Sequence, residues 1–245
     1  MSLKAYKNLP RLYIAEEGLS SDKNCLLSDH QAHYLRNVMR LKAGDALRVF
    51  NGADGEWLAN IKEINKKNVI INFYQKLLEQ KISPDVWLLA SPIKKEPFEL
   101  MIEKASELGA SRFLPVICAH TVVHRVNSER ATLIATESAE QCERLDVMQV
   151  GALAGLKDVL SAWDKNRKLL FCVEREGGQP IAKALQNLPA SGSLAILIGP
   201  EGGFTDDEIT HACAQDFVIP VSLGERILRA ETAAIAALAC VQAFR

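Results

Sequence analysis

The sequence predicts an α/β protein: a parallel sheet covered by helices, preceded by a smaller β-rich part. From Val86 onward, buried apolar runs alternate with helical stretches, which is the pattern of a parallel sheet with helices on its faces. Before that point, short β-rich runs are separated by polar turns, as in a small β-barrel or sandwich. The boundary is expected in the polar stretch between Gln75 and Asp85, so the predicted domains are residues 1–77 and 82–245.

The front part begins with a short helical pattern over 30–39. Three β-rich runs follow, ALRVFNG (46–52), EWLANIKEI (56–64) and NVIINFY (68–74), with turn sequences between them. Residues 1–77 carry twelve Lys and Arg against eight Asp and Glu, a balance of +4, whereas the whole chain is at −1. That excess would suit a phosphate-facing surface, and it would equally suit an ordinary solvated face.

The second part contains five apolar runs that predict buried strands. They are VWLLAS (86–91), RFLPVIC (112–118), KLLFCV (168–173), LAILIG (194–199) and FVIPVSL (217–223). Pro97 should open a helix that Gly109 closes. A second helix is expected over 127–145, with two polar residues, Ser138 and Gln141, on its core-facing line. Buried polar groups need partners, which a site or an interface would supply. For Ser138 alone, a hydrogen bond to neighbouring backbone is favoured.

The segment ILIGPEGGF (196–204) predicts a strand that ends in a glycine-rich loop. Glycines there allow a ligand to approach the main chain closely. Thr205 lies three residues before Glu208, the spacing of a helix N-cap and its returning carboxylate, so a helix should start beyond the loop. Strand, glycine loop and helix together are typical of nucleoside-like ligands. The spacing is not the dinucleotide fingerprint and no GK[ST] follows, which disfavours a phosphate site.

The segment LGERILRAETAAIAAL (223–238) is unusual as well. Gly224 breaks the chain directly after a predicted strand, two arginines follow, and the next stretch is small and apolar almost all the way round. Small side chains permit close backbone approach, so this helix should pack between the sheet and either the rest of the chain or a second subunit. Together with the glycine loop, this segment indicates a ligand site built from backbone.

The composition is that of a globular protein: 245 residues, 48% hydrophobic and 24% charged. The N-terminal residues lack an apolar signal core, and no run approaches the roughly 18 apolar residues that a membrane span needs. We therefore expect a cytoplasmic protein with no membrane partner. Six scattered cysteines, without a C-x-x-C pair, favour buried reduced thiols over disulfides or zinc ligands. The five histidines form no metal-ligand spacing, so no metal is expected.

Several blocks of the chain, in order, resemble one known family. They are HYLRNVMRLKAGD (33–45), EKASELGASRFLPV (103–116), ESAEQCERLDV (137–147), IGPEGGF (198–204) and LGERILRAETAA (223–234). The chain resembles the bacterial small-subunit ribosomal RNA uridine N3-methyltransferases, the RsmE family of the SPOUT superfamily. The resemblance spans nearly the whole chain. The combination of IGPEGGF with LGxRILRxETA is highly specific, whereas each block alone would be weak.

The resemblance implies a PUA-like N-terminal β-barrel that binds RNA, and an α/β domain whose C-terminal part forms a trefoil knot. Chain-connection rules disfavour knots, so the residues alone would not predict one. It also implies a homodimer and S-adenosylmethionine as the methyl donor, with S-adenosylhomocysteine as product and no metal. The methyl acceptor would be N3 of one uridine in the 16S rRNA of the small ribosomal subunit. Carried over residue by residue, the cofactor site is Leu197, Gly199, Glu201, Gly202, Gly203, Leu223, Gly224, Ile227, Leu228 and Thr232.

The implied reaction needs no metal and no covalent intermediate, because the ring nitrogen attacks an electrophilic methyl group directly and the protein mainly positions the reactants. Uracil N3 carries a proton at neutral pH, so a group must remove it or stabilise the uridinate. Arg229 is the first choice for that stabilisation, with Arg226 and Arg144 as reserves. Glu201 is the candidate base, although it could equally bind the cofactor or the loop amides.

The base edge is inaccessible in a stacked helix, so the uridine should be flipped out or single-stranded. Phosphate contacts would then fix the register of the RNA without reading its sequence. The residues expected to bind RNA are Arg11, Arg36, Arg40, Lys42, Gln141, Arg144 and Arg226. Arg36 and Arg40 are expected on one helical face; alternatively, one of them pairs with a carboxylate such as Asp29 or Asp45.

Two departures from the family pattern and three rival interpretations stay open at this stage. Family members often have a glycine and a further basic residue just before the helix that here begins KKEPFEL, whereas this chain has Lys94, Lys95, Glu96 and Pro97. Cys142 follows Gln141 where serine or threonine is common. One rival is a SPOUT methyltransferase acting on a ribose 2′-oxygen or on transfer RNA. Another is an RNA-binding ribosome-assembly factor without catalysis. A dinucleotide-dependent oxidoreductase is disfavoured, because no glycine-rich turn follows the first strand of the parallel sheet.

Overall fold

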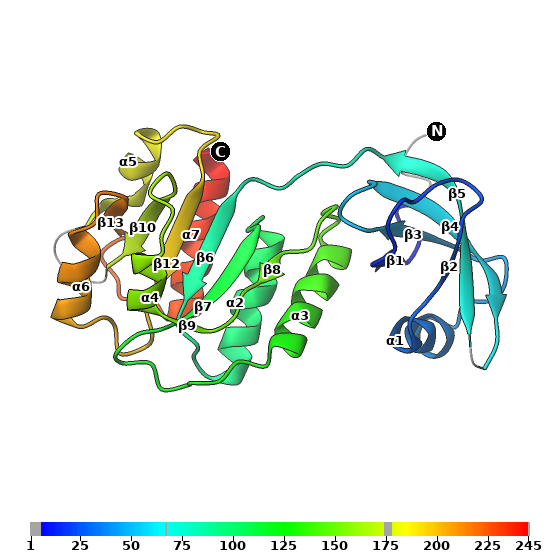
Figure 1. Ribbon diagram of the computed structural model, residues 1–245, viewed down its shortest axis with the longest axis horizontal. Helices are drawn as coiled ribbons and strands as arrows, with labels where there is room; N and C mark the ends of the chain where they lie inside the picture. The colour runs from blue at the N-terminus through cyan, green and yellow to red at the C-terminus, as the bar shows by residue number, and fades with distance from the viewer. Residues whose placement is uncertain (1–5, 67, 174–177, 245) are drawn as a thin grey trace. The chain divides into compact units, whose positions relative to one another are not determined.

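The computed structural model describes residues 6–66, 68–173 and 178–244, so the outer limits of the predicted domains, residues 1 and 245, lie outside it. The chain forms two compact units (Figure 1). One contains residues 1–82 together with 139–146, and the other contains 83–138 and 147–245. The first break falls inside the polar stretch between Gln75 and Asp85. The return of 139–146 to the first unit has no counterpart in the sequence pattern.

The first unit is built on a five-stranded sheet with the order β1-β3-β4-β5-β2. Its elements are β1 (Arg11–Tyr13), β2 (Asn24–Leu26), α1 (Asp29–His33), the π-helix η2 (Tyr34–Val38), β3 (Ala46–Phe50), β4 (Glu56–Ile64) and β5 (Val69–Leu78). Among the described strands of this sheet, the β1–β3 pair alone is parallel. Leu47, Ile61 and Phe73 are fully enclosed in the core between the strands and α1. The three long strands and the short helix predicted for this part are confirmed.

Buried charges hold the segment 139–146 in the first unit. The Arg11 side chain is 4% exposed; its Nε donates to Glu56, and its two terminal nitrogens donate to the backbone oxygens of Ala139 and Arg144, both at 2.7 Å. Arg48 donates to Glu143 at 2.7 Å. Burial lowers the pKa of Arg11, and the neighbouring Glu56 carboxylate opposes that shift. Arg11 is therefore a structural residue.

The second unit is built on a parallel sheet with the order β11-β13-β10-β12-β6-β7-β8, and a further short strand pairs with β7. The strands are β6 (Val86–Ala90), β7 (Arg112–Ile117), β8 (Gln149–Val150), β9 (Ala154–Gly155), β10 (Lys168–Cys172), β11 (Gln179–Pro180), β12 (Leu194–Ile198) and β13 (Val218–Ser222). Every pairing is parallel. All five predicted strands are confirmed; β8, β9 and β11 have two residues each, too few to show a periodic pattern.

Helices cover both faces of this sheet. They are α2 (Lys95–Glu107), α3 (Ser128–Gln141), α4 (Leu156–Ser161), α5 (Ile181–Gln186), α6 (Asp206–Cys213) and α7 (Ala230–Phe244). Successive residues of β10 point to opposite faces: Leu170 joins the core with α2, α5 and α7, whereas Phe171 joins the core with α4 and α6. In Figure 1, the red α7 runs along the sheet, in contact with β6 and β12. The α/β class with an N-terminal sheet is thus confirmed.

The second predicted helix differs from expectation at its C-terminal end. It ends at Gln141 instead of Leu145, and Glu143 then adopts a left-handed conformation with φ of 63°. Gln141 is exposed, so its predicted place on the core-facing line is wrong. Ser138 is buried and donates to the Ile134 oxygen at 2.7 Å, which confirms the expected bond to neighbouring backbone.

Two observations on the described residues concern membranes and metals. No helix among them has both the length and the apolar character needed to cross a bilayer. Within the same ranges, no group of three or more His, Cys, Asp or Glu is arranged to hold a metal ion.

Candidate functional site

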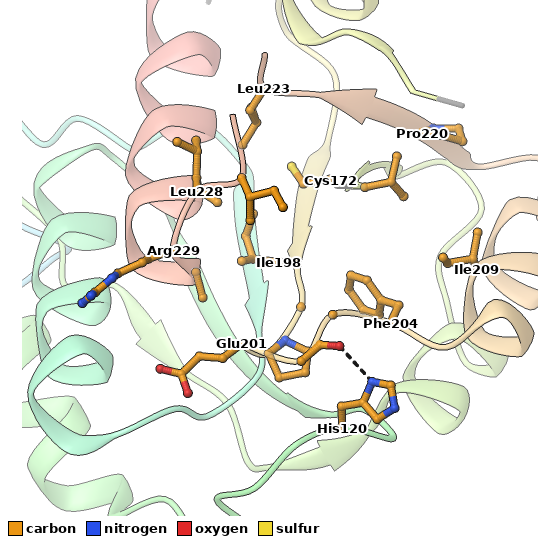
Figure 2. A pocket seen from close by; sticks show the side chains of 18 of the residues that line it. His120, Cys172, Ile198, Glu201, Phe204, Ile209, Pro220, Leu223, Leu228 and Arg229 are labelled. Carbon is orange, nitrogen blue, oxygen red and sulfur yellow. Dashed lines mark hydrogen bonds between the residues drawn. The ribbon is translucent and has the colours of Figure 1, made fainter. Parts of the chain in front are cut away.

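A cavity of about 690 Å³ opens at the carboxyl ends of β10, β12 and β13 (Figure 2). This edge is where parallel α/β sheets place their ligands, because the loops that leave neighbouring strands converge there. Ile198 at the end of β12, Cys172 at the end of β10 and Pro220 in β13 form the floor. Two loops form the walls, 199–205 and 223–229, and both were singled out in the sequence.

The first wall is a tight turn. The Gly203 N–H donates to the Pro200 oxygen at 2.9 Å, and Gly203 has φ of 68°, a conformation that glycine adopts without strain. Gly199 lies against the edge of the Phe204 ring: a Cβ added at Gly199 would come within 2.7 Å of that ring. Close approach between backbone and an aromatic ring is therefore what requires glycine at this position.

The helix beyond this loop begins as the sequence predicts. The Thr205 hydroxyl accepts from the Glu208 N–H, and Glu208 in turn accepts from the Thr205 N–H at 3.0 Å, so both halves of the capping box are present. Glu208 is also buried, at 8% exposed, and its other oxygen accepts from the Ala119 N–H at 2.8 Å. That third bond ties the start of α6 to the loop that follows β7.

The second wall passes from β13 to α7. Gly224 has φ of 121°, and its N–H donates to the Ser222 hydroxyl at 3.2 Å. Leu223 and Leu228 face the cavity from this loop, which also carries Arg226 and Arg229 at its rim. In Figure 2, the Arg229 guanidinium and the Glu201 carboxylate both extend away from the apolar side chains of the floor. Neither makes an ion pair within the described residues.

Comparisons with known proteins fit this geometry. An RNA methyltransferase domain model matches residues 80–242, and an RNA methyltransferase PUA domain model matches residues 27–74. The ribosomal RNA small subunit methyltransferase E of Rickettsia conorii is 35% identical, over 95% of this chain and 94% of its own. The chain belongs to the ribosomal RNA small subunit methyltransferase E family. The family, the enzyme class and the fold class that the resemblance implied are thereby confirmed.

Other relatives agree. The methyltransferase E of Synechocystis is 36% identical over 96% of this chain and 77% of its own. A Neisseria gonorrhoeae methyltransferase E structure bound to S-adenosyl methionine has a TM-score of 0.87 and 26% identity, and covers 96% of this chain and 98% of its own. A putative methyltransferase from Legionella pneumophila, in complex with bound SAM, has the same TM-score, 27% identity and the same coverage.

Most of the residues expected to form the methyltransferase cofactor site line the cavity. They are Gly199, Glu201, Gly202, Gly203, Leu223, Gly224, Ile227 and Leu228. Two others do not. Leu197 is fully buried in the core against α4 and α6. Alternate residues of β12 point to opposite faces of the sheet, and the Leu197 side chain lies on the face that packs against these two helices. Thr232 is exposed in the first turn of α7 and does not line the cavity either.

Some of the expected RNA-binding residues have partners within the protein, and others are exposed. Arg11 as a phosphate contact is wrong, because its guanidinium is buried among Glu56 and backbone oxygens. Arg36 donates to the backbone oxygens of Asn65 and Lys66, so the suggested pairing with Asp29 or Asp45 is absent for it in the described structure. The shared helical face with Arg40 is also wrong, because the helical segment has ended before Arg40, whose φ is 55°.

The remaining candidates differ in exposure. Arg40, Lys42 and Gln141 are exposed in the first unit. Arg144 belongs to the same unit, and its side chain, 9% exposed, pairs with Asp146 at 2.9 Å. That pairing and burial remove Arg144 as a reserve for stabilising the uridinate. Arg226 is exposed and lines the cavity.

The sequence analysis missed other parts of the wall. Phe204, Ile209 and Cys172 supply apolar surface, and His120 reaches the glycine loop from the end of β7. Burial raises the pKa of Cys172 to about 12, so its thiol stays protonated and acts as an apolar wall. The sequence did contain one indication of these residues, since they lie near the carboxyl ends of predicted parallel strands, where α/β sheets bind their ligands.

Proposed function

We propose that this protein transfers a methyl group from S-adenosylmethionine to N3 of a uridine in the 16S rRNA of the small ribosomal subunit, giving 3-methyluridine. The observation that carries the proposal is the cavity, whose two walls are the glycine loop and the 223–229 segment at one edge of a parallel sheet. The names of the relatives supply the rRNA substrate, and the family resemblance supplies the position N3. A cytoplasmic location is proposed with this function, and a ribosomal substrate supports it.

The residues of the cavity fit a nucleoside-sized cofactor. A volume of about 690 Å³ lies within the range typical of small-molecule sites. Gly199 and Gly202 leave no side chain between ligand and backbone, while Ile198, Leu223 and Leu228 offer an apolar surface. Once bound there, S-adenosylmethionine would supply an electrophilic methyl group on a sulfonium centre.

Arg229 is proposed to stabilise the uridinate. Deprotonation of N3 spreads negative charge onto the flanking carbonyl oxygens. A guanidinium next to these oxygens would lower the activation barrier for methyl transfer by stabilising that charge. Its exposure at the rim and the lack of an ion-pair partner in the described residues support this role. Glu201 lies on the opposite wall, also exposed, and is proposed to accept the N3 proton.

The proposed RNA-binding domain, residues 1–77, belongs to the first unit and is proposed to hold the substrate by phosphate contacts. Arg40 and Lys42 carry this proposal, since both are exposed, and Arg226 extends it to the cavity rim. The methyltransferase domain is proposed as 82–245. A homodimer and a trefoil knot in its C-terminal part are proposed on the family resemblance.

The test is transfer of labelled methyl from S-adenosylmethionine to small subunits isolated from cells that lack this gene, followed by nucleoside digestion. Labelled 3-methyluridine is the expected product. Label on a ribose oxygen, or on transfer RNA alone, would assign the protein to a sister specificity. Cofactor binding without transfer to any RNA would instead fit an assembly factor.

A further inference from the structure

The glycine loop is held by a residue of the connection that follows another strand. His120 follows β7, and its Nδ1 lies 3.0 Å from the Gly202 oxygen, 82 residues away in the sequence. A carbonyl oxygen can only accept, so Nδ1 must carry the proton in this contact. The two residues also pack closely: a Cβ added at Gly202 would come within 2.9 Å of the His120 Cβ.

This bond fixes one peptide plane of the loop from both sides. The Gly202 oxygen and the Gly203 N–H belong to the same planar, trans peptide group, so they point in opposite directions. The oxygen accepts from His120, while the N–H donates to the Pro200 oxygen at 2.9 Å. Holding that plane restricts the short stretch of loop that carries the neighbouring Glu201 and Gly202 N–H groups. Neither N–H has a hydrogen-bond partner within the described residues, and both residues line the cavity.

The support behind His120 is itself firm. The Ala119 N–H donates to the buried Glu208 carboxylate at 2.8 Å. The Cys118 N–H donates to the Thr121 hydroxyl at 2.8 Å, and the Thr121 N–H returns a bond to the Cys118 oxygen at 3.0 Å. Thr121 is 5% exposed. His120 is therefore the exposed residue of a turn that hydrogen bonds hold in place after β7, so its bond to Gly202 anchors the glycine loop to that turn.

We propose that His120 is a positioning residue for the methyl-donor site: it holds the Gly202–Gly203 peptide so that the free amides of the glycine loop are preorganised for the ligand. The inference rests on the proposed function only in taking S-adenosylmethionine as the ligand. It also implies that the proton transfer from uridine does not pass through the imidazole. In Figure 2, the ring lies below the loop, with Nδ1 directed at the Gly202 oxygen.

The test is calorimetric titration of the purified protein with S-adenosylmethionine, for the wild type, His120→Ala and His120→Asn. Loss of one neutral hydrogen bond predicts roughly three- to tenfold weaker binding for His120→Ala. Asparagine can place its side-chain N–H near the position of Nδ1 but has no atom at Nε2, so His120→Asn should restore affinity close to that of the wild type. His124→Ala is the matched control, since His124 is exposed on the same connection and does not line the cavity.

Steady-state kinetics separates positioning from chemistry. With His120→Ala, KM for S-adenosylmethionine should rise by a similar factor while kcat at saturation stays near the wild-type value. Unchanged affinity in His120→Ala, or His120→Asn as weak as His120→Ala, would overturn the inference. Loss of kcat in both variants would do so as well, because it would indicate proton transfer through the ring. A wild type that binds the cofactor but makes no 3-methyluridine would refute the proposed function alone, and one that does not bind it would refute both.

Discussion

Replacing Gly199 by alanine should close part of the cavity, because the added methyl group would collide with the Phe204 ring. The new Cβ would lie 2.7 Å from Cε2 and 2.9 Å from Cζ of the Phe204 ring, whereas carbon atoms in contact prefer about 3.5–4.0 Å. The ring would have to move by about 1 Å. It cannot move freely, because it packs edge-on against Phe171 with ring centroids 4.7 Å apart, and Phe171 is fully buried.

Overpacking of this kind costs about 1–3 kcal/mol. If the cost falls on the cofactor-binding conformation, affinity for S-adenosylmethionine falls by about 5- to 150-fold. Calorimetric titration measures the affinity, and thermal unfolding without ligand measures any share of the cost borne by the fold. A double-mutant cycle with Phe204→Ala tests the cause, since removing the ring should remove most of the penalty of Gly199→Ala. An equal penalty with and without the ring would refute the steric reasoning.

Three further predictions concern single residues. Arg229→Ala should lower kcat for methyl transfer by about 10²- to 10³-fold, with a much smaller change in cofactor affinity; equal losses of both would argue against a role in stabilising the uridinate. Arg11→Ala should destabilise the protein by about 3 kcal/mol in urea unfolding, because the buried Glu56 carboxylate would keep, among the described residues, Arg48 at 3.6 Å as its one ion-pair partner; a loss below about 1 kcal/mol would contradict this. The hydrogen bond from Arg167 lowers the pKa of Asp85 in the folded protein. The stabilisation from this ion pair is therefore fully present above the ordinary aspartate pKa of about 3.9, and it is lost as the pH falls through the lower pKa of Asp85 in the folded state. The difference in unfolding free energy between wild type and Asp85→Asn should therefore be constant above about pH 5 and shrink below about pH 4, and a difference independent of pH would contradict the assignment.

The cavity could be predicted from the sequence to a useful degree because its walls are local. The glycine-rich loop after β12 and the capping box of Thr205 and Glu208 depend on residues within a few positions of one another, and both are as expected. Parallel strands also bring their carboxyl ends to one edge, so the loops after β12 and β13 had to meet. The prediction for Leu197 failed because every residue of the motif was expected to face the ligand, whereas alternate residues of a strand point to opposite faces of the sheet.

The contacts that could not be predicted join distant parts of the chain. Arg11 donates to the oxygen of Ala139, 128 residues away, and no periodic pattern carries that information. The same is true of His120 and Gly202. Arg11 lies in the front part of the chain, where basic residues outnumber acidic ones, and this suggested an RNA contact, whereas burial against Glu56 decided its role.

Strands shorter than about four residues could not be predicted from the sequence for a different reason. β1 and β2 have three residues each, which is too short for an alternating pattern to emerge. They are defined by pairing with β3 and β5, so they exist only in the context of the sheet.

The most direct measurement of the central claim is the 3-methyluridine content of 16S rRNA, by nucleoside mass spectrometry, from cells lacking this gene. The cells should be complemented with the wild type, with Arg229→Ala, or with an empty vector. The account predicts 3-methyluridine in the first and almost none in the other two, with all other modified nucleosides unchanged. Undiminished 3-methyluridine in the cells with the empty vector would contradict it.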